Sequence, residues 1–211
     1  MPDAGGEVLA TRVAFLELQD ERRLVQEGYE LLDEKRMMLA TEIMRQLRRH
    51  RELGQQVLEL AREARAALTA AVDALGFDDL TVQRPQSLDA HVLHGHSTQF
   101  LGISLMEASL EPPAPGTEAP PTQLLPEARA CAGAFHGLLA AHAAAAACAG
   151  NLRRLAREYR RTERRARALE NVVLPEIDLS LRYIEEQLDA LDQEEAVRVR
   201  NAGRSASMAG A

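Results

Sequence analysis

The sequence predicts an all-α fold, a long antiparallel two-helix coiled coil with a small β-hairpin and loop inserted in its middle. Aromatic residues make up only 3% of the 211 residues and tryptophan is absent, whereas 46% of residues are hydrophobic. Such a composition suits thin helix–helix contacts better than the thick core of an α/β enzyme. Two long stretches carry apolar residues at alternating steps of four and three, and a short β-favouring stretch separates them.

The first long helix is expected over residues 7–76. No proline occurs between Leu9 and Leu75, Thr11 is a candidate N-cap, and Gly76 is a plausible stop signal. The apolar stripe is narrow, which is typical of a coiled-coil seam. It consists of Leu39, Ile43, Leu47, Leu53, Val57, Leu60, Ala64, Ala67, Ala71 and Leu75.

The second long helix is expected over residues 124–201, followed by a flexible tail at 202–211. Each helix would be roughly 100 Å long at 1.5 Å per residue, and neither stripe is wide enough to stabilise a single helix. Antiparallel pairing of the two solves this problem within one chain. The second seam is Leu125, Ala128, Phe135, Leu138, His142, Ala145, Ala149, Leu152, Leu155, Tyr159, Thr162, Ala166, Leu169, Val173, Ile177, Leu181, Ile184, Leu188 and Leu191.

The middle segment, residues 77–123, has a different character. Three short β-favouring runs, at 80–83, 90–95 and 98–106, are separated by polar turns and predict a small hairpin. A proline-rich loop follows at 111–121, which cannot form the interior of a helix or sheet. We expect this segment to form a cap at the far end of the helical hairpin.

An alanine-rich tract spans residues 140–150. It has two interpretations, which are compatible. Alanine is the best helix former, so the tract can simply reflect helix propensity. Its small side chains would also let two helix backbones approach closely.

Eight arginines lie between Arg153 and Arg167, and we expect them to lie opposite Arg45, Arg48, Arg49 and Arg51 in one electropositive belt. One interpretation is a solvated helix face with intrahelical ion pairs. The other is a contact zone for an acidic partner surface. Nucleic acid is disfavoured, because the net charge is −7 and no aromatic residues interleave with the arginines to stack on bases.

The histidines and cysteines are the remaining candidates for chemistry. His91, His94 and His96 could suggest a metal, but no cysteine or carboxylate cluster lies nearby in sequence, so no metal site is expected. Cys131 and Cys148 would be about 25 Å apart on one helix, which is too far for a disulfide. They are interpreted as reduced, small core residues.

No motif for catalysis or for membrane insertion stands out. The sequence lacks a phosphate-binding P-loop and a nucleophile elbow, and a thin rod offers no desolvated pocket for a reactive side chain. No apolar run of ~20 residues and no signal peptide are apparent. The chain is therefore expected to be non-catalytic and cytoplasmic, reaching a membrane only through a partner.

Two segments carry a resemblance to a known family. In residues 11–39 the resemblance is carried by Thr11, Arg12, Gly28, Leu31, Leu32, Lys35, Arg36 and Leu39, and Lys35 is the only lysine in the chain. In residues 160–200 it is carried by Thr162, Arg164, Arg165, Ala168, Leu169, Glu170, Val172, Val173, Pro175, Arg182, Tyr183 and Ile184. The order and spacing of these residues resemble the D-type shaft subunit of V/A-type ATPases.

The resemblance implies a central rotor shaft that transmits torque in an ATP-driven, ion-translocating complex. Its implied partners are the catalytic and regulatory subunits of a hexamer, a small F-type central-stalk subunit and a funnel-shaped adaptor on the membrane ring. ATP and Mg²⁺ would bind the partner subunits, and this chain would need no cofactor. The middle segment would lie at the membrane-facing end.

Rotor contacts and a helix bend are expected at particular residues. Pro175 lacks a backbone N–H and should bend the second helix. The contact candidates are Thr11, Arg12, Arg45, Arg48, Arg49, Arg161, Arg164, Arg165, Arg167, Glu170 and Arg182.

A structural coiled-coil scaffold is the alternative function. It accounts for the seams and the arginines, but not for the two matched segments or the position of Pro175. An enzyme with its own active site is a third possibility, which ATP hydrolysis by the isolated chain would support.

Overall fold

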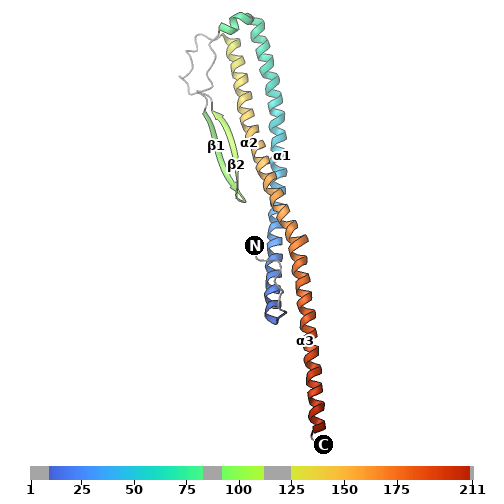
Figure 1. The fold of residues 1–211 in the computed structure, drawn as a ribbon. Helices are drawn as coiled ribbons and strands as arrows, with labels where there is room; N and C mark the ends of the chain where they lie inside the picture. The colour runs from blue at the N-terminus through green and yellow to red at the C-terminus, as the bar shows by residue number, and fades with distance from the viewer. Residues whose placement is uncertain (1–9, 83–91, 112–124, 210–211) are drawn as a thin grey trace. The chain divides into compact units, whose positions relative to one another are not determined.

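A computed structural model describes residues 10–82, 92–111 and 125–209 and confirms the predicted fold class (Figure 1). The order of elements is α1 (Arg12–Val82), β1 (Val92–Phe100), β2 (Ile103–Glu111), α2 (Pro126–Ala168), a π-helical turn η3 (Leu169–Val173) and α3 (Leu174–Ala209). Met1–Arg36 and Arg160–Ala211 form one compact unit, and Met37–Tyr159 forms a second.

In the first unit, the start of α1 pairs antiparallel with the end of α2, η3 and α3. A Cβ atom built on Gly28 would lie 3.9 Å from Leu169 Cδ1, so the two segments touch there. The predicted seam residues Thr162, Ala166 and Ile184 are buried. Leu191, also expected in the seam, is 54% exposed.

In the second unit, the remainder of α1 pairs with α2. Every predicted seam residue of α1 from Leu39 to Leu75 is buried or half-buried, which confirms that stripe. The stripe of α2 was wrong in part, because Leu125, Phe135 and His142 are exposed. Two predicted residues of this stripe, Ala128 and Leu155, are buried as expected, and Ala141 and Cys148, which were not predicted, are buried with them. Ala141, Cys148 and Leu155 follow a heptad frame that the uniform alanine tract conceals.

The ends of α1 follow the predicted signals. Thr11 is the N-cap, since its hydroxyl oxygen accepts a hydrogen bond from the Ala14 N–H at 3.1 Å. Gly76 interrupts the helix with φ 76° and ψ 160°, a conformation that only glycine adopts without strain. Helix resumes for residues 77–82, so the strand expected at 80–83 was wrong where the structure describes it.

The strands β1 and β2 form an antiparallel hairpin with Phe100 paired to Ile103. Leu101 and Gly102 form the turn, and both have positive φ (50° and 83°), as a type I′ turn requires. The expected strand at 98–106 therefore turns in its middle. His91 and the proline-rich residues 112–121 lie outside the described residues.

The hairpin lies beside the helix pair rather than forming a cap at its far end (Figure 1). Leu105 is buried with Leu39 of α1 and Leu155 of α2, and Phe100 and Ile103 pack against this cluster. The expectation of a terminal cap was wrong, because these apolar side chains are buried against the flank of the helices.

The second long helix is interrupted just before Pro175. In η3 the Leu174 N–H bonds to the Leu169 carbonyl, one residue further back than in an α-helix. This wider turn accommodates a proline that has no N–H of its own to donate. Beyond the turn, α3 continues to Ala209, because no proline ends the helix earlier. A flexible tail from residue 202 had been expected there.

Candidate functional site

The first unit carries ion pairs between the two ends of the chain. Arg12 Nη2 lies 3.1 Å from Asp192 Oδ2, and Arg22 Nε lies 2.6 Å from Asp178 Oδ1. Arg12 and Asp192 are largely exposed, and Arg22 and Asp178 are about half exposed, so each pair contributes little to stability. The pairs do show which residues of α1 and α3 lie opposite each other.

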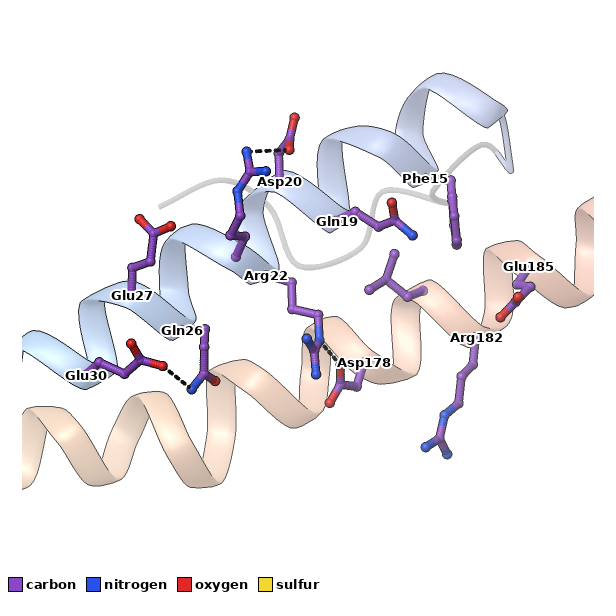
Figure 2. Close-up of a pocket in the computed structure, with 12 residues that line it drawn as sticks. Phe15, Gln19, Asp20, Arg22, Gln26, Glu27, Glu30, Asp178, Arg182 and Glu185 are labelled. Carbon is purple, nitrogen blue, oxygen red and sulfur yellow. Dashed lines mark hydrogen bonds and ion pairs between the residues drawn. The ribbon is translucent and has the colours of Figure 1, made fainter. Parts of the chain in front are cut away.

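An open groove of about 840 Å³ runs between α1 and α3 in this unit. Figure 2 shows Phe15, Gln19 and the Arg22–Asp178 pair along it, with Arg182 pointing away from α1. Charged and amide side chains dominate its walls, and it is open to solvent. Such a groove lacks the desolvated surface that a small-molecule site needs.

The arginines of the first unit are directed to solvent. Arg161, Arg164 and Arg165 are exposed on α2, and Arg167 pairs with Glu163 at 2.7 Å. Glu170 is exposed on η3. Arg161, Arg164, Arg165 and Arg167 therefore give the end of α2 an exposed, largely positive surface.

The expected register of the two arginine groups was wrong. Gln46 contacts Cys148, and Leu39 packs with Leu155, so residues 45–51 lie opposite the alanine-rich tract. The error arises because a heptad seam of alanine and leucine permits several alignments of similar apolar burial.

Two arginines of α1 in the second unit, Arg45 and Arg49, bind neighbouring carboxylates. Arg45 forms two hydrogen bonds to Glu42, both 2.8 Å long, and Arg49 Nη1 lies 2.8 Å from Glu107 Oε1 on β2. The hydrogen bond and the charge of Glu42 raise the pKa of Arg45 above its ordinary value. Arg48 is exposed.

Glu42 is a buried carboxylate with specific partners. Burial alone would raise the pKa of Glu42, but hydrogen bonds from Arg45 and Gln46, together with the charge of Arg45, outweigh burial and lower the pKa. The group is therefore held in its charged form, and it orients both neighbours.

A polar layer crosses the helix pair at Gln46. The Cys148 thiol donates to the Gln46 carbonyl oxygen at 3.4 Å, and both side chains are buried. Burial raises the pKa of Cys148, so the thiol stays protonated. Cys131 is free and half-buried.

Asn151 joins α2 to the hairpin. Its Oδ1 accepts a hydrogen bond from the Met106 N–H, and its Nδ2 donates to the Met106 carbonyl, both at 2.8 Å. Arg154 Nη2 also donates to Asn151 Oδ1, at 2.6 Å. Asn151 is 4% exposed, so these bonds satisfy a buried amide.

The described histidines of the hairpin, His94 and His96, do not belong to a group of three or more metal ligands. His94 Nε2 lies 2.7 Å from Glu111 Oε2, and His96 is exposed on the same strand. Across residues 10–82, 92–111 and 125–209, no group of three or more His, Cys, Asp or Glu side chains could hold a metal ion.

One apolar stretch was missed in the sequence. A helical window of 18 residues within Pro126–Gly203 has the length and composition to cross a membrane, and 11% of it is buried. These two properties alone are weak support for a membrane span.

The buried polar residues were also missed, although the spacing contained a signal. Gln46 lies seven residues after Leu39 and seven before Leu53, which is a seam position. Asn151 lies three residues after Cys148 and four before Leu155. A polar residue within a heptad frame is a candidate for setting the register.

Comparison with known proteins links the chain to one family. Residues 14–204 match the family described as the D subunit of ATP synthase. The A-type ATP synthase D subunit of Methanopyrus kandleri is 29% identical over 202 residues, covering 92% of this chain and 84% of that protein. The V-type ATP synthase D subunit of Anaeromyxobacter dehalogenans is 30% identical over 202 residues, covering 90% and 92%. That of Thermotoga neapolitana is 26% identical over 198 residues, covering 92% and 95%.

Proposed function

The chain belongs to the family of ATP synthase D subunits, and from this premise we propose that it is the central rotor shaft of a V/A-type ATP synthase complex. In this role it carries torque between an ATP-hydrolysing hexamer and an ion-translocating ring in the membrane. The torque passes in either direction, towards ATP synthesis or ion pumping.

The observation that carries this proposal is the pairing of the two ends of the chain. Arg12 contacts Asp192 and Arg22 contacts Asp178, although more than 150 residues separate the partners in each pair. In a two-helix rod built in this way, the contacts of the seam transmit a rotation from one helix to the other. It does not need covalent chemistry to do so.

Coupling to ATP hydrolysis follows from the uneven surface of the rod. Exposed arginines occupy α2 in the first unit, whereas α1 exposes apolar side chains such as Leu24 and Leu31. Each catalytic interface of a surrounding hexamer would meet a different side of this rod. Differential contact of this kind makes otherwise equal interfaces unequal in conformation and affinity.

The partners and cofactors follow from the same proposal. The shaft would contact the catalytic and regulatory subunits of the hexamer, the small F-type subunit and the funnel-shaped adaptor of the ring. ATP and Mg²⁺ would bind the partner subunits, and the shaft itself would be non-catalytic. It would remain in the cytoplasm, attached to the membrane through the complex.

Co-expression with the catalytic, regulatory and F-type subunits of the same organism tests this proposal. Gel filtration should show one copy of this chain per hexamer, and the ATPase rate of the hexamer should change when the chain is present. A matched preparation without the chain is the control.

Two results would contradict the proposal. Elution of the chain separately from the hexamer, without binding to it, would favour a structural scaffold. Hydrolysis of ATP by the purified chain alone would favour an enzyme with its own active site.

A further inference from the structure

The outer edge of β2 is bound by a side chain of α2. One edge of β2 pairs with β1, and on the other edge Met106 exchanges two hydrogen bonds with the Asn151 amide, each 2.8 Å long. An adjacent strand residue would form the same donor and acceptor pair with Met106. Asn151 therefore takes the place of a neighbouring strand on the surface of α2.

The Asn151 amide is held in one orientation. Its Oδ1 also accepts a hydrogen bond from Arg154 Nη2 at 2.6 Å, so the oxygen faces two donors and the nitrogen faces one acceptor. A flipped amide would place its NH₂ against both donors. The contact is thus specific as well as buried.

The same short stretch of β2 also reaches α1. Glu107, the residue after Met106, accepts a hydrogen bond from Arg49 Nη1 at 2.8 Å. Leu105, the residue before Met106, is buried with Leu39 of α1 and Leu155 of α2. Three consecutive residues of β2 therefore contact both helices of the second unit.

Small side chains make room for this strand. Ala144 and Ala147 of α2 line a small space of about 30 Å³ against Met106 and Glu107. On the other strand, a Cβ atom at Gly95 would lie 3.3 Å from Met106 Cε, closer than ordinary packing allows. The alanine tract thus serves the approach of a strand as well as that of a helix.

We propose that β2 is a brace between α1 and α2, and that Asn151 is the positioning residue that fixes it. Rotation or sliding of one helix against the other would break the contact of Met106 with α2, the contact of Glu107 with α1, or the packing of Leu105. The Arg49–Glu107 pair is about half exposed, so it stabilises the contact of β2 with α1 less than Asn151 stabilises the contact with α2. Reversing one charge of the pair would place two carboxylates together and turn this attraction into repulsion. The brace would make the shaft twist less under torque, and this consequence rests on the proposed function.

Hydrogen exchange on the purified full chain tests the brace without any partner subunit. Asn151→Asp keeps the side-chain shape and the Oδ1 acceptor but replaces the Nδ2 donor with a second acceptor oxygen, which then faces the Met106 carbonyl. We expect the amides of β2 to exchange at least about tenfold faster in this variant. Amides near 42–50 of α1 should also exchange faster, because the strand no longer ties α1 to α2.

Gln56→Glu is the matched control, since it makes the same amide-to-acid change on an exposed side chain of α1. It should exchange like the parent chain. Unchanged exchange in β2 of Asn151→Asp would overturn the role of Asn151. Faster exchange in β2 with unchanged exchange in residues 42–50 of α1 would show that β2 does not link the two helices. That result would also overturn the proposal.

A pair of charge reversals provides a second test if the Asn151 variant fails to fold. Arg49→Glu should speed exchange near 42–50, and adding Glu107→Arg should restore the parent rate. Absence of both effects would contradict a tie between β2 and α1. Because these measurements need only this chain, their failure would leave the rotor proposal to be judged by the reconstitution experiment.

Discussion

At the residue scale, buried polar side chains determine how the helices of the second unit align. An apolar seam of alanine and leucine loses little when one helix slides by a heptad. Sliding would separate the Cys148 thiol from the Gln46 carbonyl, and it would also separate β2 either from Asn151 of α2 or from Arg49 of α1. Specific alignment therefore depends on residues that contribute little apolar burial.

Glu42 gives a prediction about pH. Its pKa lies below the ordinary value of 4.5, so the folded chain favours the charged form. The stability that Glu42 contributes is present above its unfolded pKa and is lost as pH falls through the lowered folded pKa. Glu42→Gln should therefore lower the urea midpoint more at about pH 7 than at about pH 3.

The control for this prediction is Glu59→Gln, which neutralises an exposed carboxylate on the same helix. Urea unfolding followed by circular dichroism at both pH values provides the comparison. An effect of Glu42→Gln that is equal at the two pH values would show that its charge is not the stabilising feature.

Thr11 gives a second prediction at this scale. Its hydroxyl satisfies the Ala14 N–H at the start of α1, and Thr11→Ala should destabilise that end by about 1 kcal/mol. Hydrogen exchange of the first turns of α1 should accelerate accordingly. Thr69→Ala is the control, because the Thr69 hydroxyl donates to a carbonyl within the same helix and caps nothing.

At the scale of elements, the second long helix contains a built-in irregularity. The π-helical turn Leu169–Val173 ends two residues before Pro175, and all five of its residues are partly or fully exposed. The wide turn removes the clash that a proline ring makes with the carbonyl four residues earlier. We expect this interruption to lower stability relative to an uninterrupted α-helix, so that Pro175 serves the shape of the helix rather than its folding.

Replacement of Pro175 tests this interpretation. Pro175→Ala restores an N–H and should raise the free energy of unfolding by about 1 kcal/mol or more, with slower hydrogen exchange in residues 169–176. Pro126→Ala is the control, since Pro126 is the first residue of α2, where a missing N–H costs nothing. A loss of stability in Pro175→Ala would show that the turn is required by the surrounding packing instead.

At the scale of the whole molecule, exposed charge is the feature through which the proposed shaft would meet its partners. Arg164 and Arg165 are exposed in the first unit and belong to a segment dense in arginine. Long-range attraction to an acidic surface speeds assembly and weakens as salt is added. In the proposed rotor role, such screened contacts would let the shaft turn against other subunits without a rigid bond.

Reversal of two of these charges gives the corresponding prediction. The variant Arg164→Glu with Arg165→Glu should reduce co-elution with the partner subunits, or the change in ATPase rate that the shaft causes, by roughly tenfold. The control reverses Arg62 and Arg65, two exposed arginines of α1 in the other unit. Equal assembly and equal ATPase rates for the parent and the Arg164 and Arg165 variant would contradict a role in contact.

Much of this protein could be derived from the sequence, because its signals are local. Heptad spacing predicted the two long helices and the seam from Leu39 to Leu75. Thr11 indicated the start of the first helix and Gly76 a stop, and the structure has an N-cap at Thr11 and an interruption of the helix at Gly76. The matched segments around Lys35 and Pro175 indicated the family, which the match over residues 14–204 establishes. Each of these signals depends on spacing or on the backbone preference of one residue.

The remaining features depend on contacts between segments far apart in the sequence. Only the tertiary structure showed that Arg49 faces Glu107 rather than the second group of arginines, and that Leu105 lies between Leu39 and Leu155. A repetitive seam gives several alignments similar apolar burial, so its sequence cannot choose among them. The choice is made by a few buried hydrogen bonds, such as those of Asn151 with Met106, and these form only when the strand and the helix have already met.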